Sequence, residues 1–156
     1  MRVPRLVAAF VALAAITAGC GFSPPAAPPT PTADCGPGPT PEAVTSEFAL
    51  LPPAAWKDTA RGSTPDCRLW WVVVTSGDAS DSPQQVLFFD RDKPVGSPTP
   101  DPRTYITVTA QGDTTANVQY QWRQGQDPAC CPTGIGSARV TLEEGRLTVL
   151  DPIPGP

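Results

Sequence analysis

Hydrophobic positions follow three successive patterns along the chain. The first pattern is an apolar run of 13 positions, residues 6–18, which follows Arg2 and Arg5. A helix of this length spans about 20 Å, which is less than the roughly 30 Å hydrocarbon core of a bilayer. A short apolar run behind basic residues is typical of a secretion signal that is removed after export. We therefore predict a signal peptide over residues 1–19.

The end of this run, Ile16-Thr17-Ala18-Gly19-Cys20, resembles a bacterial lipobox. In such a motif cleavage takes place before the cysteine, whose thiol is acylated. Two or three acyl chains would anchor the protein firmly, because each buried methylene contributes about 0.8 kcal/mol and a single chain binds only marginally. The alternative is an ordinary secretory signal with a coincidental cysteine. We predict lipidation of Cys20, which would place the protein on the extracytoplasmic face of the cell membrane.

A proline-rich segment follows the lipobox. Eight prolines occur in the 19 residues 23–41, interleaved with Ala, Thr and Gly. Such a composition favours extended polyproline II structure and cannot bury a hydrophobic core. We expect residues 20–34 to form a disordered tether that spaces a folded domain, residues 35–156, from the membrane. A proline-rich ligand for a partner module is the alternative.

The second pattern is helical. Thr40 has the residue type of an N-cap, and Pro41 suits the first helical position. Val44 and Phe48 then follow at helical spacing, until two consecutive prolines end the run. We predict one short amphipathic helix over residues 41–51.

The third pattern has a period of two, which is typical of strands. In the last four of six predicted strands, apolar and polar residues alternate, so that one face of the sheet is apolar and the other contacts water. In the first two, Trp70, Trp71, Phe88 and Phe89 make both faces apolar, which places these strands in the middle of the sheet. The predicted fold is α+β and mainly β: a single antiparallel sheet of about six strands with one short N-terminal helix. The predicted strands are residues 69–74, 85–90, 104–109, 115–122, 137–142 and 146–150.

The same four aromatic rings form a candidate binding face. One helix of about three turns cannot cover both faces of the first two strands. Either the proline-containing loops 92–103 and 123–136 fold over the uncovered face, or an apolar patch stays open to a partner. We expect the loops to cover it, because a large apolar patch is unusual on a secreted monomer.

Four cysteines lie beyond Cys20: Cys35, Cys67, Cys130 and Cys131. An even number in a small exported domain indicates two disulfides with three possible connectivities. We favour Cys35 with Cys67, because they flank one compact segment, and closing a loop of about 30 residues would stabilise the fold by about 3 to 4 kcal/mol. Cys130 would then bond its own neighbour in a strained ring, so the crossed connectivities stay open. This vicinal pair is the candidate for redox chemistry, although it lacks the two-residue spacer of thioredoxin-type motifs.

Composition excludes several classes of function. The 156 residues include 22 Pro and 13 Gly, which leaves room for one domain, and the net charge of −4 comes without a basic stretch that could follow a nucleic-acid backbone. The sequence contains no His, the commonest general base and metal ligand. The acidic turns 77–82 and 90–92 lack the spacing of a calcium loop, and the adjacent Glu143 and Glu144 would point apart on extended backbone. We predict no catalytic residue, no metal, no cofactor and no nucleic-acid partner.

Several short motifs together resemble a known family. The motifs are residues 67–72 (CRLWWV), 85–89 (QVLFF), 94–96 (PVG), 118–122 (VQYQW) and 138–140 (ARV), followed by Gly145 and Pro152. The chain thereby resembles the LppP/LprE family of actinobacterial lipoproteins over about residues 35–154. The resemblance implies an envelope lipoprotein without an established activity, and it brings no catalytic residue.

Three classes of function remain. The first, which we expect, is a non-enzymatic, lipid-anchored envelope module whose sheet docks an envelope protein or a wall component. Exposure of Trp70 or Phe88 would support it, and full burial of both would weaken it. The second is a lipid or glycolipid carrier, which needs a cavity of several hundred Å³, large for so short a chain. The third is a redox protein that uses Cys130 and Cys131.

Overall fold

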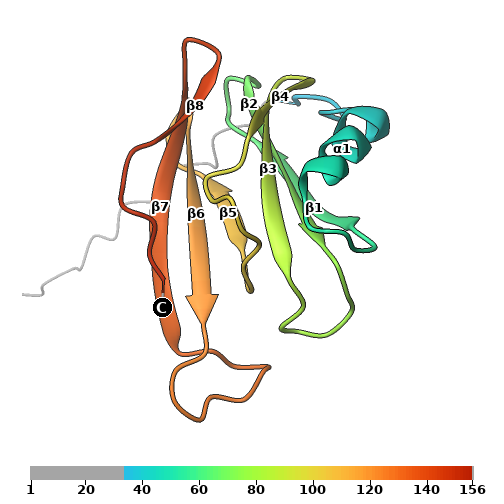
Figure 1. Ribbon diagram of the computed structural model, residues 1–156. Coiled ribbons are helices and arrows are strands. Elements are labelled where there is room, and N and C mark those ends of the chain that lie inside the picture. Colours follow the sequence, from blue (N-terminus) through green and yellow to red (C-terminus); the bar gives the residue numbers. More distant parts are fainter. Residues whose placement is uncertain (1–33, 156) are drawn as a thin grey trace, which may run out of the picture. The chain divides into compact units, whose positions relative to one another are not determined.

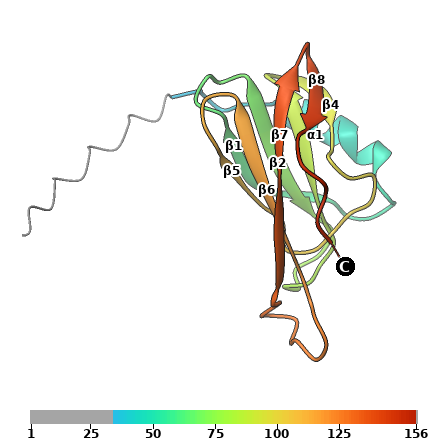
Figure 2. The same ribbon diagram turned by 90° about the vertical axis from the view of Figure 1, so that its left-hand side faces the viewer.

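The computed structural model describes residues 34–155. The predicted signal peptide, the acylation of Cys20 and all but the last residue of the predicted tether lie outside these residues. The described part folds into two four-stranded antiparallel sheets and one short helix, with strand orders β1-β2-β3-β4 and β5-β6-β7-β8 (Figures 1 and 2). The elements are α1 (Pro41–Glu47), the 3-10 turn η1 (Phe48–Leu50), β1 (Lys57–Ser63), β2 (Leu69–Thr75), β3 (Gln84–Asp90), β4 (Lys93–Gly96), β5 (Thr107–Ala110), β6 (Thr115–Trp122), β7 (Gly134–Glu143) and β8 (Arg146–Val149).

The helix begins where the sequence predicts it. The side-chain oxygen of Thr40 accepts a hydrogen bond from the backbone N–H of Ala43 (3.2 Å), and Pro41 occupies the first turn. Val44 is buried, and the chain continues through η1 to Leu50. Helical structure therefore covers nearly all of the predicted span, with the last turn wound as a 3-10 helix. Within the described residues, no helix is long and apolar enough to cross a membrane.

The prediction of a single six-stranded sheet is wrong. β2 and β3 do lie in the middle of a sheet, but the ladders of β5 to β8 join these four strands only to one another. The β4–β5 connection contains Pro98, Pro100 and Pro102, which lack the N–H needed to extend a ladder. The physical reason is burial. β2 and β3 are apolar on both faces, and the apolar face of a second sheet covers the face that the short helix leaves free.

Two hydrophobic clusters lie on opposite sides of β2 and β3. The cluster between the sheets contains Leu69, Trp71, Val73, Val86, Phe88, Ile106, Ala116, Val118, Tyr120 and Val140. The cluster beneath α1 contains Val44, Trp56, Trp70, Val72, Val74, Leu87 and Phe89. The layers are therefore helix, sheet, sheet. The expected loop cover over β2 and β3 is also wrong, because β5–β8 takes that place.

Two strands, β1 and β4, lack a hydrophobic pattern, and the sequence did not predict them. Most of β1 is exposed, yet it pairs with β2 along its length, with an irregularity between Asp58 and Ala60. Gly62 is required there, because a Cβ atom at this position would overlap the ring of Trp71. Backbone pairing to a buried neighbour is sufficient to form such an edge strand, so no alternation is needed.

Candidate functional site

The four rings proposed as a binding face lie in the interior. Trp70 is 7% exposed, Trp71 6%, Phe88 1% and Phe89 0%. Neighbouring residues of a strand point to opposite faces, so each strand sends one ring toward the other sheet and one toward α1. These residues build the two cores and leave no aromatic patch on β2 and β3.

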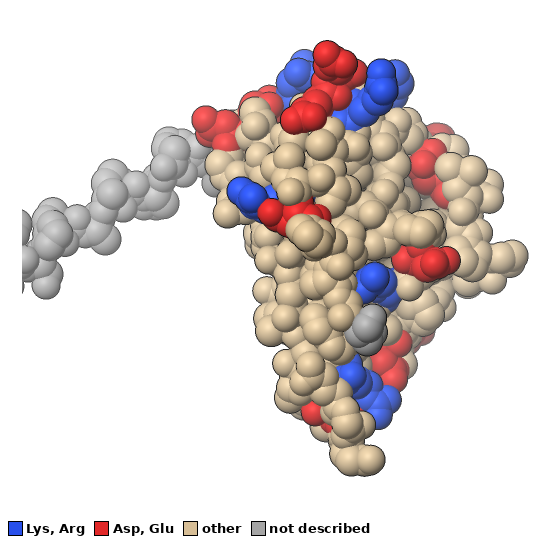
Figure 3. Space-filling model, turned by 60° about the vertical axis from the view of Figure 1, so that its left-hand side comes forward, with Lys and Arg blue, Asp and Glu red and all other residues tan. Residues whose placement is uncertain are grey.

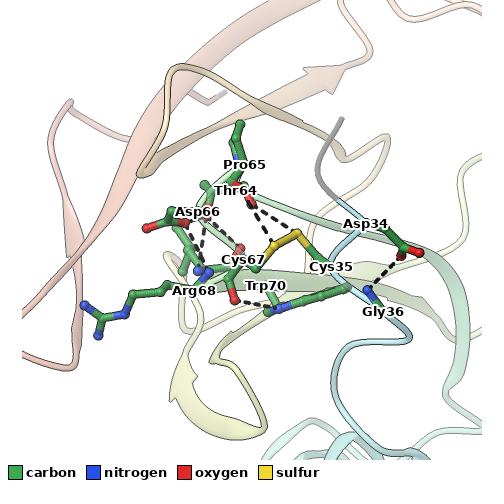
Figure 4. Close-up of a disulfide and its surroundings, with 10 residues drawn as sticks. Asp34, Cys35, Gly36, Thr64, Pro65, Asp66, Cys67, Arg68 and Trp70 are labelled. Carbon is green, nitrogen blue, oxygen red and sulfur yellow. Dashed lines mark hydrogen bonds between the residues drawn. A yellow bond between two sulfur atoms is a disulfide. The ribbon is translucent and has the colours of Figure 1, made fainter. Parts of the chain in front are cut away.

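A disulfide joins Cys35 to Cys67, with 5.2 Å between their Cα atoms (Figure 4). This is the pairing that the sequence favoured. Cys67 takes a left-handed conformation (φ 58°), and its carbonyl accepts a hydrogen bond from Nε1 of Trp70 (3.2 Å). Gly38 lies against the same indole, since a Cβ atom there would overlap it. The disulfide therefore fastens the segment before α1 over Trp70, which is a structural role.

The second disulfide joins the neighbours Cys130 and Cys131 in the exposed β6–β7 loop. The carboxylate of Asp127 organises this loop, accepting hydrogen bonds from the backbone N–H of Gln124 (2.8 Å) and from the backbone N–H (2.8 Å) and hydroxyl (2.7 Å) of Thr133. These bonds, led by that from Gln124, lower the pKa of Asp127. The vicinal pair is thus displayed on a loop with internal order.

A groove of about 400 Å³ lies at the end of the sandwich where β6 finishes. One wall comes from β6 and the other from the β4–β5 connection and the turn before β3. The groove brings together an indole, an amide, a hydroxyl, a guanidinium and a carboxylate. Its lining residues are Pro83, Asp101, Pro102, Arg103, Thr104, Gln121 and Trp122.

Glycines of β7 determine the position of Trp122. Trp122 and Gly134 are partners in the β6–β7 ladder, and a Cβ atom at Gly134 would overlap the indole. A Cβ atom at Gly136, on the same face, would overlap Pro154 and would lie at ordinary contact distance from the tip of the indole. The ring therefore lies against bare backbone and stays half-buried, whereas Trp56, Trp70 and Trp71 are at most 9% exposed. The alternation of β6 predicted the face that Trp122 occupies, but not that it borders a groove.

Arg103 lies on the other side of the groove and interacts there with two other residues. Its Nη1 donates a hydrogen bond to the carbonyl of Pro154 (2.8 Å), and its guanidinium carbon lies 5.3 Å from the ring centroid of Tyr120, a cation–π distance. Burial raises the pKa of Tyr120 to about 12. Arg103 therefore positions the C-terminal segment beside the groove and contributes a fixed positive charge.

An ion pair also holds the C-terminal segment. Arg139 donates from Nε and Nη2 to the two carboxylate oxygens of Asp151, both at 2.8 Å, and its backbone N–H donates to the same carboxylate at 2.9 Å. The side-chain hydrogen bond from Arg139 is the main cause that lowers the pKa of Asp151 to about 2. The C-terminal segment is therefore held by both Arg103 and Arg139.

The groove lining contains one carboxylate, that of Asp101, and one hydroxyl, that of Thr104, which can form hydrogen bonds with a ligand. Within the described residues, no group of three His, Cys, Asp or Glu side chains is placed to hold a metal ion. Of the acidic turns, Asp78 pairs with Lys57, and Asp90 accepts a hydrogen bond from Arg68 (3.0 Å).

A small β-sandwich with a disulfide-fastened N-terminal segment and a groove at one end is the class of domain that the structure defines. A family model described as LppP/LprE lipoprotein matches residues 61–145. Three curated relatives, one from Mycobacterium bovis and two from Mycobacterium tuberculosis strains, bear the name "Putative lipoprotein LppP" and are 46% identical over 144 residues, covering 87% of this chain and 82% of theirs. The chain belongs to the LppP/LprE lipoprotein family, which confirms the resemblance found in the sequence. No solved structure matches it.

Proposed function

We propose that this chain is an envelope lipoprotein anchored through acyl chains on Cys20 to the outer face of the cell membrane, where it acts as a non-catalytic binding module. Its folded domain holds an envelope protein or a wall component in the groove beside Trp122. Membership of a lipoprotein family supports the anchor. The lipobox-like end of the apolar run supports Cys20 as the attachment site.

The observation that carries the binding role is the half-buried indole of Trp122. An aromatic face bordered by a few polar groups is the usual composition of a ligand site. The other three tryptophans are committed to the cores. The groove is bordered by Asp101 and Arg103, which gives it a polar rim unlike the apolar interior that a lipid carrier needs.

The anchor is tested by Cys20→Ser in the expressing bacterium. We expect the wild-type protein to incorporate a fatty-acid probe and to partition into detergent, and the variant to lose both properties, because it lacks the acylated thiol. Ser23→Ala, three residues further on, is the control and keeps both. Incorporation by the Cys20→Ser variant would contradict the proposal.

The groove is tested by the fluorescence of full-length protein in detergent micelles during titration with solubilised envelope fractions. Binding is expected to shift the emission of Trp122, because the three buried tryptophans are shielded from a ligand. The double variant Asp101→Ala/Gln121→Ala removes polar groups of the groove and should weaken binding about tenfold.

The matched control is Asp113→Ala/Gln111→Ala, which removes the same two groups from the exposed β5–β6 turn. Equal losses in the two double variants would contradict a role for the groove. Turnover of a substrate that stops when one side chain is replaced would contradict the non-catalytic role.

A further inference from the structure

The outer face of β6 carries a row of amide side chains. Asn117, Gln119 and Gln121 alternate with the buried residues Ala116, Val118 and Tyr120, so the three amides point away from the core. Within the described part of the chain, none of the three amides forms a hydrogen bond with another protein group. Each therefore keeps a donor and an acceptor available to a ligand.

Hydroxyl groups flank this row on both sides. In the ladders, Gln119 faces Thr107 of β5 and Ser137 of β7, and Asn117 faces Thr109 of β5. Alternate residues of a strand lie about 6.7 Å apart, so the row extends over about 13 Å. The last member, Gln121, also lines the groove. Gln121 therefore connects the row to one side of the groove, whereas the indole of Trp122 lies on the opposite face of β6, against Gly134 and Gly136.

The row itself has little net charge and few apolar anchors. Arg139, which faces Asn117 from β7, is bonded through two nitrogens to Asp151, and Arg103 lies in the groove, where it bonds the carbonyl of Pro154. In Figure 3, which brings this side of the molecule forward, the charged side chains lie mainly toward the edges, with uncharged surface between them. Ile135, 59% exposed, lies beside Gln121 at one end of the row.

These properties select among the possible partners. A protein interface usually has aromatic, Met or Arg side chains at its centre, and the middle of this row has none. An anionic polymer needs unpaired cations. A polymer rich in hydroxyl groups needs donors and acceptors in equal measure, which amides and hydroxyls supply.

We infer that the outer face of β5–β8 binds a neutral polysaccharide along the row Asn117, Gln119 and Gln121, as far as the side of the groove that Gln121 lines. The inference rests on the proposed function and names the ligand class of that site. It also requires no conformational change, since the row belongs to a regular strand.

The experiment is co-sedimentation of the full-length lipoprotein, in detergent micelles, with mycobacterial cell wall freed of lipid and digested with protease. The neutral polysaccharide fraction of that wall, immobilised on beads, and alginate beads serve as neutral and acidic probes. We expect retention on the digested wall and on the neutral beads, and little on alginate.

The double variant Asn117→Ala/Gln119→Ala should bind the neutral beads about tenfold more weakly, because two hydrogen-bonding side chains are lost. The matched control Gln111→Ala/Gln126→Ala removes two exposed amides outside the row and should bind as wild type. Unfolding in urea and near-UV circular dichroism establish that both variants fold.

The outcomes separate the two proposals. Retention by untreated wall that protease digestion abolishes would show a protein partner and would overturn the polysaccharide inference, while leaving the binding function intact. Equal retention on alginate would also overturn it. Failure to bind any envelope fraction, with no change in Trp122 emission, would overturn both.

Discussion

The two sheets of this protein differ in how they meet water. β2 and β3 are buried on both faces, between α1 and the second sheet, and they hold four of the large aromatic rings. The sheet β5–β8 is covered on one face, and its other face carries amides and hydroxyls. Large hydrophobic rings gain most free energy by leaving water, so the many aromatic residues of β2 and β3 indicate a packed core and not a binding face. The exposed polar side chains lie instead on the outer face of β5–β8 and at its end beside Trp122.

The largest effect is expected when one residue is replaced in each sheet and the two losses of stability are compared. Phe88→Ala leaves a cavity between the sheets and should lower the free energy of unfolding by about 3 to 5 kcal/mol. Gln119→Ala, on the outer face, should change it by less than about 0.5 kcal/mol. Urea unfolding followed by circular dichroism measures both. Similar losses would show that the outer face is also part of the core.

The second largest effect concerns the two disulfides, which should contribute unequally to the free energy of unfolding. The double variant Cys35→Ser/Cys67→Ser opens a loop between residues 32 positions apart and should cost about 2 to 4 kcal/mol of unfolding free energy. Cys130→Ser/Cys131→Ser releases a bond between neighbours, which restricts the unfolded chain little. Urea unfolding without reductant compares them. A larger loss of unfolding free energy in Cys130→Ser/Cys131→Ser would contradict the structural role given to the disulfide between Cys35 and Cys67.

The packing of the Trp122 indole against β7 is tested by Gly134→Ala. The added methyl group overlaps the indole, so we expect a loss of about 1 to 3 kcal/mol and a shift in tryptophan emission as the ring moves. Ser137→Ala, on the exposed face of β7, is the control and should leave the emission unchanged. Unchanged emission in Gly134→Ala would mean that the indole does not rest on β7.

The smallest effect concerns the ion pair of Arg139 and Asp151. A carboxyl whose pKa is lower in the folded state stabilises the fold above its unfolded pKa of about 4, and the contribution is lost as the pH falls through the folded value. With the pKa of Asp151 at about 2, we expect NMR signals of residues 151–155 to broaden between pH 4 and 2. Asp151→Asn should show that change already at pH 7, and Asp113→Asn should behave as wild type. Sharp signals of residues 151–155 in Asp151→Asn at pH 7 would contradict the role of this ion pair in holding the C-terminal segment.

Sequence patterns predicted most elements, and the reasons differ from one to another. The capping of α1 depends on Thr40 and Pro41, which are local, and β6 has the bounds that alternation gave it. The strands β1 and β4 were missed, because an edge strand forms by pairing with a neighbour. The aromatic residues Trp70 and Phe88 suggested a binding face, since a sequence does not show what covers a strand.

By itself, the sequence determined the family, the helix, the apolar strands and the favoured pairing of Cys35 with Cys67, because these depend on residue type and on spacing along the chain. Only the tertiary structure decided that the strands divide into two sheets. It also brought Arg103 to one groove with Gln121 and Trp122, from a segment that is separate in the chain. The physical reason is that burial is a property of both partners: a face apolar in the sequence becomes core or surface according to which other face covers it.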